Sequence, residues 1–397
     1  MEWKEVRLGD VCSELSDGLH KAPKFIVNGE YIFVNAKNLY NGYILDNDPT
    51  KKTSHEEYLK YKKPLGKHTI LYSIDGTIGN IAKYRGEKCV LGKGACYINC
   101  NPEIVESSYL YYQLQSPHFK SYIHLMSTGS TIKHISLKTM RDYVFELPSL
   151  EDQRRIASIL SSLDRKIELN NKINADLEEM AQAIFKNWFV DFEPFKDGKF
   201  VDSELGMIPE GWKVGSPYEY VKVVYGAPYK SAKFNDNGEG LPLIRIRDLK
   251  DCNPQFYTPE ILPQTEYVNM GDIVAGMDAE FVPHIWKGKT GLLNQRVCKL
   301  MPQQTSISNL FVLYLMKPEL EFVQSYKTGT TVSHLGKADI DKFVVVLPPL
   351  EVVDECSKLL DSILQRIKNI SAESRTLSLL RDTLLPRLMS GEIEIPE

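Results

Sequence analysis

The stretch 128–151, TGSTIKHISLKTMRDYVFELPSLE, decides the fold because it recurs at 328–351 as TGTTVSHLGKADIDKFVVVLPPLE. At this offset of 200 residues, nine of the 24 positions are identical and no gap is needed. The identities include His134 with His334 and the Leu-Pro-x-Leu-Glu segments that begin at Leu147 and Leu347. Repetition at a fixed period indicates that one structural unit occurs more than once. The chain is therefore expected to be a tandem duplication.

Weaker matches lie upstream of this repeat. Residues 108–117 match 309–318, and both segments read as a short amphipathic helix. Residues 34–39 match 244–249, and both alternate apolar with polar side chains, which predicts a half-buried strand. The offset differs between these matches, so insertions are expected in the loops between them.

A long helix is predicted after each Leu-Pro-x-Leu-Glu segment. Gly is absent from 130–197, Pro is absent from 149–193, and both are absent from 350–385. Apolar residues recur there at spacings of four and three, which is typical of a heptad seam, and Asn170 and Asn174 interrupt it. Two such seams most simply pair with each other, although each helix could instead pack only on its own half. The residues expected to mediate helix pairing and partner contacts are Ile156, Leu160, Leu163, Ile167, Leu177, Leu360, Ile363, Ile367, Ile370 and Leu377.

Strand and turn signals dominate the remainder of each half. Short alternating runs are separated by Asn-Gly, Asp-Gly and Gly-Lys turns, which predicts a twisted mixed sheet with a few short helices. The predicted fold class is α+β with a pseudo-twofold tandem repeat. Its parts are a globule at 1–148, a helix at 149–193, a globule at 194–348 with a leading linker at 194–212, a helix at 349–390 and a tail at 391–397.

Composition limits the classes of function. The chain has 48 Lys and Arg against 52 Asp and Glu, so a generally basic coat is excluded while local patches are not. Residues 1–148 hold 19 basic against 16 acidic residues, whereas 200–348 hold 15 against 17. No apolar run approaches the roughly 20 residues of a membrane helix, and the N-terminus carries no apolar signal segment. A cytoplasmic protein without a membrane partner is expected.

Catalytic motifs are missing or isolated. The sequence contains no GxxxxGK[ST], HExxH or GxSxG motif. Asn253-Pro-Gln-Phe256 resembles the target-base signature of amino-methyltransferases, but no strand, Gly-x-Gly turn and helix accompanies it to hold S-adenosylmethionine. Cys89, Cys96 and Cys100 lack the second ligand pair of a usual zinc site. We therefore predict no catalytic residue and no metal site.

Cations in loops are the candidates for nucleic-acid binding, because Lys and Arg neutralise phosphates and Arg can pair with guanine. The Thr-Gly-x-Thr loops that begin at Thr128 and Thr328 could hold a phosphate or simply form a turn and helix cap. Arg245 and Arg247 lie in a predicted strand and are expected to face away from the core, where they could equally be solvated edge charges. The candidate DNA-binding residues are Lys21, Lys24, Lys37, Arg85, Thr131, Lys133, His134, Lys230, Lys233, Arg245, Arg247, Lys287, Arg296, Thr331 and His334.

Together these features resemble the specificity subunit of a type I restriction-modification system over almost the whole chain. The resemblance rests on the two halves and on four segments: LPSLEDQRRI at 147–156, NWFVDF at 187–192, LGMIPEGW at 205–212 and LRDTLLPRLMSG at 380–391. The opening of the second helix, LEVVDEC at 350–356, lacks the Gln-Arg pair of the first. This departure weakens the expectation that both helices make identical partner contacts.

The resemblance implies two target recognition domains, each reading one half of a split asymmetric site on double-stranded DNA through the major groove. It implies that the helices pair antiparallel as a spacer and that two modification subunits dock on the chain. Those subunits would bring S-adenosylmethionine for N6-adenine methylation, and restriction subunits would cleave with ATP and Mg. This chain would hold no cofactor and would not be an enzyme by itself. A structural or regulatory scaffold and a stand-alone DNA methyltransferase are the alternatives.

Overall fold

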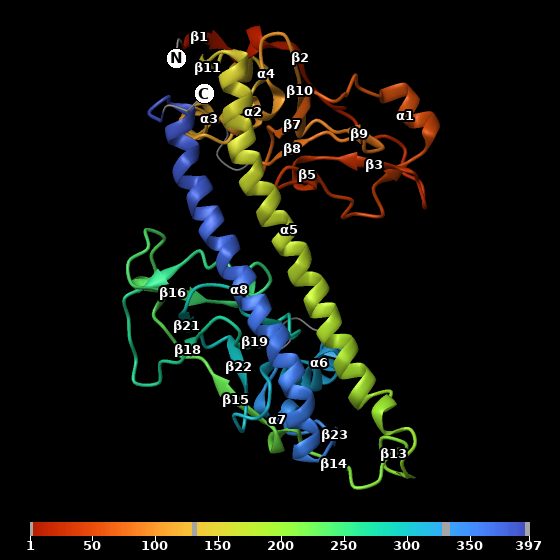
Figure 1. The fold of residues 1–397 in the computed structure, drawn as a ribbon. Coiled ribbons are helices and arrows are strands. Elements are labelled where there is room, and N and C mark those ends of the chain that lie inside the picture. The colour runs from red at the N-terminus through yellow and green to blue at the C-terminus, as the bar shows by residue number, and fades with distance from the viewer. Residues whose placement is uncertain (1–2, 129–132, 328–333, 394–397) are drawn as a thin grey trace. The chain divides into compact units, whose positions relative to one another are not determined.

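The computed structural model describes residues 3–128, 133–327 and 334–393 and divides the chain into two compact units (Figure 1). The first unit comprises Met1–Lys166 and Leu377–Glu397, and the second comprises Ile167–Thr376. Each unit is a globule of strands and short helices joined to part of two long helices, α5 (Leu150–Phe189) and α8 (Leu350–Met389). The predicted α+β class is confirmed.

The first unit is built on a four-stranded antiparallel sheet and a smaller mixed sheet. The first has the order β2-β10-β7-β8, and the second has the order β6-β3-β9, in which β3 and β9 are parallel. The strand bounds are β1 Lys4–Arg7, β2 Cys12–Asp17, β3 Tyr31–Val34, β4 Leu39–Tyr40, β5 Tyr43–Ile44, β6 Lys52–Thr53, β7 Thr69–Ser73, β8 Ile81–Lys83, β9 Cys89–Leu91, β10 Ala95–Cys100 and β11 Val144–Leu147. The short helices are α1 His55–Tyr61, α2 Ser107–Gln113, α3 Pro117–Met126 and α4 Leu137–Arg141.

The second unit repeats this plan. Its antiparallel sheet has the order β15-β22-β19-β20, and its mixed sheet has the order β17-β16-β21-β18 with β16 and β21 parallel. The strand bounds are β12 Phe200–Val201, β13 Ile208–Pro209, β14 Lys213–Gly215, β15 Val221–Tyr225, β16 Leu241–Ile244, β17 Tyr257–Thr258, β18 Tyr267–Val268, β19 Ile273–Gly276, β20 His284–Ile285, β21 Gly291–Leu293, β22 Val297–Pro302 and β23 Val345–Leu347. The helices are α6 Asn309–Lys327 and α7 Lys337–Ile340. The duplication predicted from the repeat is confirmed.

The long helices pair antiparallel, as the partners in each unit show. Asp164 meets Arg381 at 2.9 Å in the first unit. In the second unit, Asn170 donates to Glu373 at 2.9 Å and Asn174 donates to Ser371 at 3.1 Å. The partner's number falls as the first number rises, which defines antiparallel pairing. No helix in the described part of the chain is both long and apolar enough to cross a membrane.

The seam residues also build the cores of the two units. In the first unit, Ile156 and Leu160 of α5 are buried in the same apolar cluster as Leu388 of α8 and the antiparallel sheet. In the second unit, Leu360 and Ile367 of α8 are buried in a cluster with Ala181 and Phe185 of α5. Both interpretations of the seam therefore apply, since the helices pack on each other and on the globules. Ile363 and Ile370 are also buried, whereas Leu163, Ile167, Leu177 and Leu377 are half-buried.

The predicted strands at 34–39 and 244–249 are wrong. The strands β3 and β16 end at Val34 and Ile244, and a 3₁₀ turn follows each, at Ala36–Asn38 and Ile246–Asp248. The side chain of Asn38 accepts the N–H of Asn35 at 3.0 Å, and that of Asp248 accepts the N–H of Arg245 at 2.9 Å. Such local side-chain bonds compete with sheet pairing, and they end the strand here.

The openings of α5 and α8 are held in different ways. Gln153 is buried in the first unit, where its Oε1 accepts the N–H of Glu106 at 2.8 Å. Its Nε2 donates to the carbonyls of Ile104 and Pro148 at 3.2 and 2.9 Å. The equivalent residue of α8 is a fully buried Val353, and Ser357 accepts the N–H of Ser308 at 2.9 Å instead. The missing glutamine of the second helix therefore reflects a different internal packing, whereas Arg154 of the first helix is exposed.

Candidate nucleic-acid interface

In the first unit, five segments meet where the parallel strands β3 and β9 end. The turn at 92–95 follows β9 and closes with a bond from the N–H of Ala95 to the carbonyl of Gly92 at 3.1 Å. The N–H of Lys93 donates to the carbonyl of Leu19 at 2.8 Å, and the carbonyl of Gly94 accepts the N–H of Ile74 at 3.0 Å. A Cβ at Gly94 would lie 3.6 Å from the backbone nitrogen of Ala36, which places segment 35–38 against the same turn. We call residues 17–20, 35–38, 74–76, 92–95 and 133–134 the first loop cluster.

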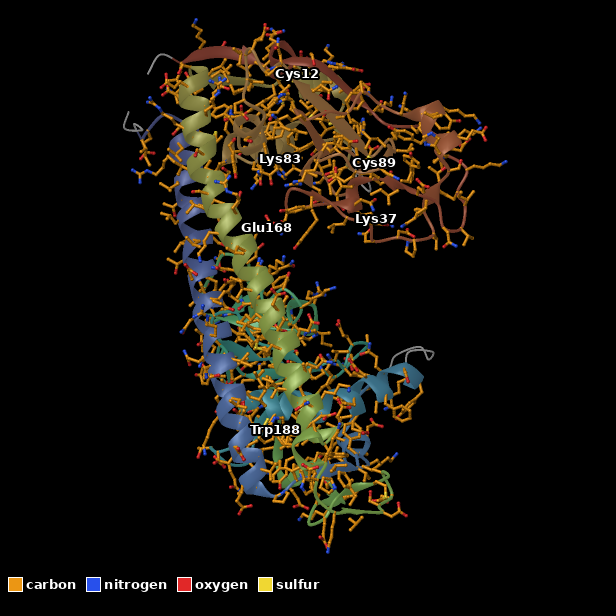
Figure 2. All side chains as sticks on the ribbon, turned by 45° about the vertical axis from the view of Figure 1, so that its right-hand side comes forward. Cys12, Lys37, Lys83, Cys89, Glu168 and Trp188 are labelled. Atoms are coloured by element: carbon orange, nitrogen blue, oxygen red, sulfur yellow. The ribbon has the colours of Figure 1, made fainter. Side chains whose placement is uncertain are left out.

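A histidine–aspartate pair fastens the last of these segments. Nδ1 of His134 bonds to the carboxylate of Asp75, and the carbonyl of Lys133 accepts the N–H of Gly76 at 3.0 Å. An ionised carboxylate only accepts hydrogen bonds, so Nδ1 carries the proton. The exposed Lys133 and the half-exposed His134 are thereby held beside the exposed Lys93 and Lys37. Lys37 lies at the edge of the first globule (Figure 2) and is 3.6 Å from Asp48.

The second unit contains an equivalent second loop cluster, made of residues 225–227, 245–248, 277–278, 294–297 and 334–335. The N–H of Val297 donates to the carbonyl of Asn294 at 2.9 Å, and that of Gln295 donates to Ala227 at 3.0 Å. These are the same bonds that Ala95 and Lys93 make in the first cluster. The N–H of Leu335 bonds to the carbonyl of Met277 at 2.7 Å, which corresponds to Ile135 and Ile74 at 2.9 Å.

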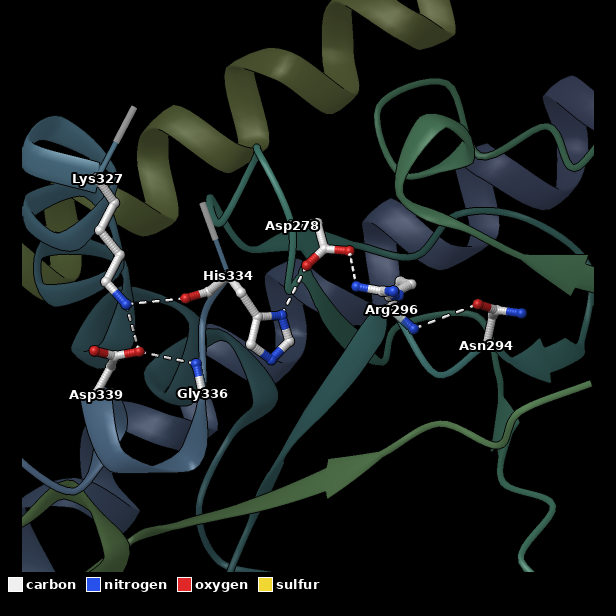
Figure 3. Close-up of polar contacts among 7 residues, drawn as sticks. All are labelled: Asp278, Asn294, Arg296, Lys327, His334, Gly336 and Asp339. Carbon is white, nitrogen blue, oxygen red and sulfur yellow. Dashed lines mark hydrogen bonds and ion pairs between the residues drawn. The ribbon is translucent and has the colours of Figure 1, made fainter. Parts of the chain in front are cut away.

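The carboxylate of Asp278 joins two cationic or polar side chains of the second cluster (Figure 3). One oxygen lies 2.7 Å from Nδ1 of His334, and the other accepts from Nη1 of Arg296 at 2.5 Å. Lys327 donates to the carbonyl of His334 at 2.9 Å and to Asp339 at 2.6 Å. The second cluster thus positions its histidine as the first does, and adds an arginine on the same carboxylate.

Arg245 corrects one expectation, because it does not face away from the core. Its side chain is only 19% exposed, and its guanidinium lies 4.2 Å from the ring centroid of Phe256. Nε and Nη2 are buried and have no hydrogen-bond partner in the described part of the chain. Burial lowers the pKa of Arg245, and burial likewise raises the pKa of Asp248, whose carboxylate is 3.7 Å away. Only Arg247, at the position equivalent to Lys37, is exposed as expected.

Several other candidates lie outside the two clusters. Lys24 and Lys230 make equivalent contacts in the two units. The backbone N–H of Lys24 donates to Glu57 at 3.0 Å, and that of Lys230 donates to Glu260 at 2.9 Å. Their side chains are exposed, as is that of Lys21, which follows the first cluster by one residue. Lys233 also pairs with Glu260, at 3.0 Å.

Arg85 and Lys287 are equivalent to each other and are engaged in internal contacts. Nη1 of Arg85 donates to the carbonyl of Gly42 at 2.6 Å, and the guanidinium stacks over Tyr43 at 4.1 Å. Lys287 forms an ion pair with Glu178 of α5. Thr131 and Thr331 lie outside the described residues.

The sequence did not single out several residues that the clusters contain. Lys93, Asp75 and Asp278 were missed, whereas Gln295 stands beside the candidate Arg296 in the loop segment Asn294-Gln-Arg296. Lys93 is an isolated cation, and each aspartate is remote in sequence from its histidine. The signal that could have found the aspartates is the pairing of Ile74-Asp75 with Met277-Asp278 at nearly the offset of the two histidines.

The cysteines are free thiols, and burial raises the pKa of every one. For Cys12, Cys89, Cys96, Cys298 and Cys356 the pKa rises to about 12, and for Cys100 and Cys252 it also rises. In the described ranges, no three His, Cys, Asp or Glu side chains gather as a metal site would require.

The fold and the clusters define a duplicated protein in which two similar sheet units present equivalent cationic loop clusters. The family model described as the type I restriction modification DNA specificity domain matches residues 1–179 and 209–377. The chain therefore belongs to this family of DNA specificity subunits, which serve in sequence recognition.

Relatives match along nearly the full chain. The type I restriction enzyme MjaIX specificity subunit of Methanocaldococcus jannaschii is 28% identical over 94% of this chain and 86% of its own length. The type I restriction enzyme HindI specificity subunit of Haemophilus influenzae is 24% identical over 99% of this chain and 100% of its own. The crystal structure of the type I restriction-modification S subunit from M. genitalium has a TM-score of 0.54, at 16% identity, over 100% of this chain and 97% of that one. This last likeness supports the fold.

Proposed function

We propose that each unit reads one half of a split, asymmetric DNA site and that its loop cluster supplies the contacts. The observation that carries this proposal is the equivalence of the two clusters, which have the same backbone bonds and different side chains. The first cluster offers Lys37, Lys93 and Lys133, which suit phosphates. The second offers Arg247, Gln295 and Arg296, which suit base edges as well. One scaffold with two sets of side chains would read two different half-sites.

The long helices are proposed to set the distance between the half-sites. Each contains 40 residues, which corresponds to about 60 Å at a rise of about 1.5 Å per residue. DNA rises about 3.4 Å per base pair, so a spacer of this kind is of the right order to separate two short half-sites.

The outer faces of the helices are proposed to dock the two modification subunits. The predicted seam residues are mostly engaged in the cores, so they leave the docking to other positions. Large apolar side chains that remain exposed include Leu169, Met180, Leu359, Leu379 and Leu380. Exposed apolar surface of this kind is typical of protein contacts.

The chemistry is assigned to the partner subunits. The modification subunits would bind S-adenosylmethionine and methylate adenine, and the restriction subunits would use ATP and Mg. This chain would select the site and would hold no cofactor. Because the second globule is acidic overall, we expect the isolated chain to bind DNA weakly until the partners close around the duplex. Tight, site-selective binding by the purified chain at moderate salt would contradict that expectation.

The experiment that tests the proposed function is to co-express this chain with modification subunits from the same genome and to map N6-methyladenine by single-molecule sequencing. We expect methylation confined to one split motif, which disappears when this chain is deleted. A stable complex that produces no motif would instead favour a regulatory scaffold. Binding of S-adenosylmethionine by the chain alone would favour the stand-alone methyltransferase.

A further inference from the structure

The turns at 92–95 and 294–297 have one backbone and two different sets of side chains. The sequences are Gly-Lys-Gly-Ala in the first unit and Asn-Gln-Arg-Val in the second. Their hydrogen bonds place Gly94 at the position of Arg296, and each position neighbours the aspartate that binds a histidine. Arg296 is therefore a side chain that the second unit adds to a framework that both units share.

The orientation of Arg296 leaves one edge of its guanidinium available. Nη1 is bonded to Asp278 at 2.5 Å, and the side chain is 54% exposed. The edge formed by Nε and Nη2 has no other hydrogen bond among the described residues. Two parallel N–H groups on this edge match the O6 and N7 acceptors that guanine presents in the major groove.

The same contacts favour a base over a phosphate as the partner of Arg296. The carboxylate of Asp278 holds the plane of the guanidinium, and base edges require such planar alignment while phosphates accept from many directions. Its negative charge also repels a phosphate, whereas a neutral base edge is not repelled. Arg247 lies in the same cluster but is exposed and forms no hydrogen bond to a carboxylate among the described residues.

We propose that Arg296 reads a guanine in the half-site of the second unit, with Asp278 and His334 as positioning residues. His334 bonds to Asp278 at 2.7 Å, and its own backbone is held by Lys327 at 2.9 Å (Figure 3). The carboxylate that orients the guanidinium is therefore itself fixed from the far side. This inference rests on the proposed function of the second unit.

The test uses the full chain in complex with its modification subunits and the methylation motif as its readout. We expect Arg296→Gln to lose one guanine from one half-site, with discrimination at that position falling about tenfold or more, while the other half-site is unchanged. Arg296→Lys should relax the same position. Lys289→Gln, an exposed cation outside the cluster, is the control and should leave the motif intact.

The positioning residues are tested at the same base. Asp278→Asn and His334→Ala should weaken discrimination at the position that Arg296 reads, and His334→Gln should restore part of it because an amide can still donate to Asp278. A purely structural role would instead lower methylation at all sites without changing the motif. The proposal would be overturned if substitutions of Arg296, Asp278 and His334 all lowered methylation at every site without changing the motif. It would also be overturned if Arg296→Gln left the motif unchanged.

The first unit offers a gain-of-function test. A Cβ at Gly94 would meet its nearest atom, the backbone nitrogen of Ala36, at 3.6 Å and would lie 3.8 Å from Cβ of Asp75, so the backbone at this position admits a side chain. We expect Gly94→Arg to add a guanine preference to the other half-site. If Arg296→Gln acts as expected and Gly94→Arg changes nothing, the equivalence of the two turns as reading positions is wrong. If the unaltered complex shows no motif, the proposed function itself fails, which distinguishes the two failures.

Discussion

The two units share the backbone of their loop clusters and differ in the side chains that this backbone carries. A glycine within each cluster allows a close backbone contact with the turn at 92–95 or 294–297. A Cβ at Gly18 would lie 2.3 Å from the carbonyl oxygen of Leu91, and one at Gly226 would lie 2.1 Å from that of Asn294. Around these shared contacts, Lys93 stands in place of Gln295 and Gly94 in place of Arg296. The comparison shows that backbone hydrogen bonds and close backbone contacts determine the structure of the loop clusters. Side chains that project from it are free to differ, and that is what a pair of recognition domains requires.

The largest expected effect comes from giving the start of α5 the residue that α8 has at the equivalent position. Gln153→Val introduces this residue, but it removes the partner of the buried carbonyl of Pro148 and of the part-buried N–H of Glu106 and carbonyl of Ile104. We expect the free energy of unfolding of the first unit to fall by about 3 kcal/mol, because a buried group left without a partner costs about 1–3 kcal/mol and the two part-buried groups add a smaller amount. Chemical denaturation measures this. Arg154→Gln, on the exposed side of the same turn, should change little, and an equally small effect of Gln153→Val would show that water replaces the amide.

The second prediction concerns Lys83, a half-buried residue of the first globule (Figure 2) at the position where the second unit has the buried Ile285. Its ammonium is 4.4 Å from the ring centroid of Tyr111, and burial lowers the pKa of Lys83 to about 8. Between this pKa and the ordinary value of 10.5, the unfolded chain binds more protons than the folded chain, so the stability of the unaltered protein rises with pH in that window.

Lys83→Ile should therefore stabilise the first unit by about 1–3 kcal/mol at pH 7, since one pKa unit corresponds to about 1.4 kcal/mol. The advantage should shrink as pH rises from 8 towards 10.5, the range in which the folded lysine is already neutral. Thermal unfolding at a series of pH values measures both effects. Lys120→Gln, an exposed substitution, should shift neither, and an advantage of Lys83→Ile that does not vary with pH would contradict the assigned cause.

The smallest expected effect concerns the polar residues in the helix seam, which differ between the two units. The first unit closes its seam with the ion pair of Asp164 and Arg381, whereas the second contains Asn174, which is buried and whose Oδ1 has no partner in the described part of the chain. Ser371 keeps a bond to the carbonyl of Ile367 at 2.7 Å without Asn174. Asn174→Leu should therefore raise the free energy of unfolding by about 1 kcal/mol, measured in urea.

A polar residue in a seam fixes the register of the helices at some expense of stability. Asn170→Leu provides the matched comparison, because Asn170 donates to Glu373 and its loss should give less stabilisation. A fall in stability for Asn174→Leu would contradict the view that its oxygen lacks a partner.

The sequence predicted what depends on neighbours along the chain. The repeat around His134 and His334 gave the duplication, and the absence of Gly and Pro placed both long helices to within a few residues. The first helix ends at Phe189, and the left-handed backbone of Phe192, with a φ of 55°, belongs to the following turn. Local composition was sufficient for these elements.

The loop clusters could not be predicted in the same way, because the sheets assemble them from segments far apart in the sequence. Lys93 reaches its place through a bond to Leu19, and Asp75 meets His134 across 59 residues. Arg245 was misplaced because its alternation with isoleucines fits both a strand and a strand followed by a capped 3₁₀ turn. The bond from its N–H to Asp248 decides between the two, and a pattern of apolar and polar residues does not contain that bond.

The seven cysteines, five of them buried and two half-buried, make the protein convenient for site-specific chemistry. A reagent that alkylates thiolates finds little of the reactive form at neutral pH when burial raises the pKa of every cysteine. A single new cysteine on an exposed turn, such as Lys93→Cys, would then be labelled selectively, with no native cysteine removed. A fluorophore attached there would report the approach of a duplex to the first unit.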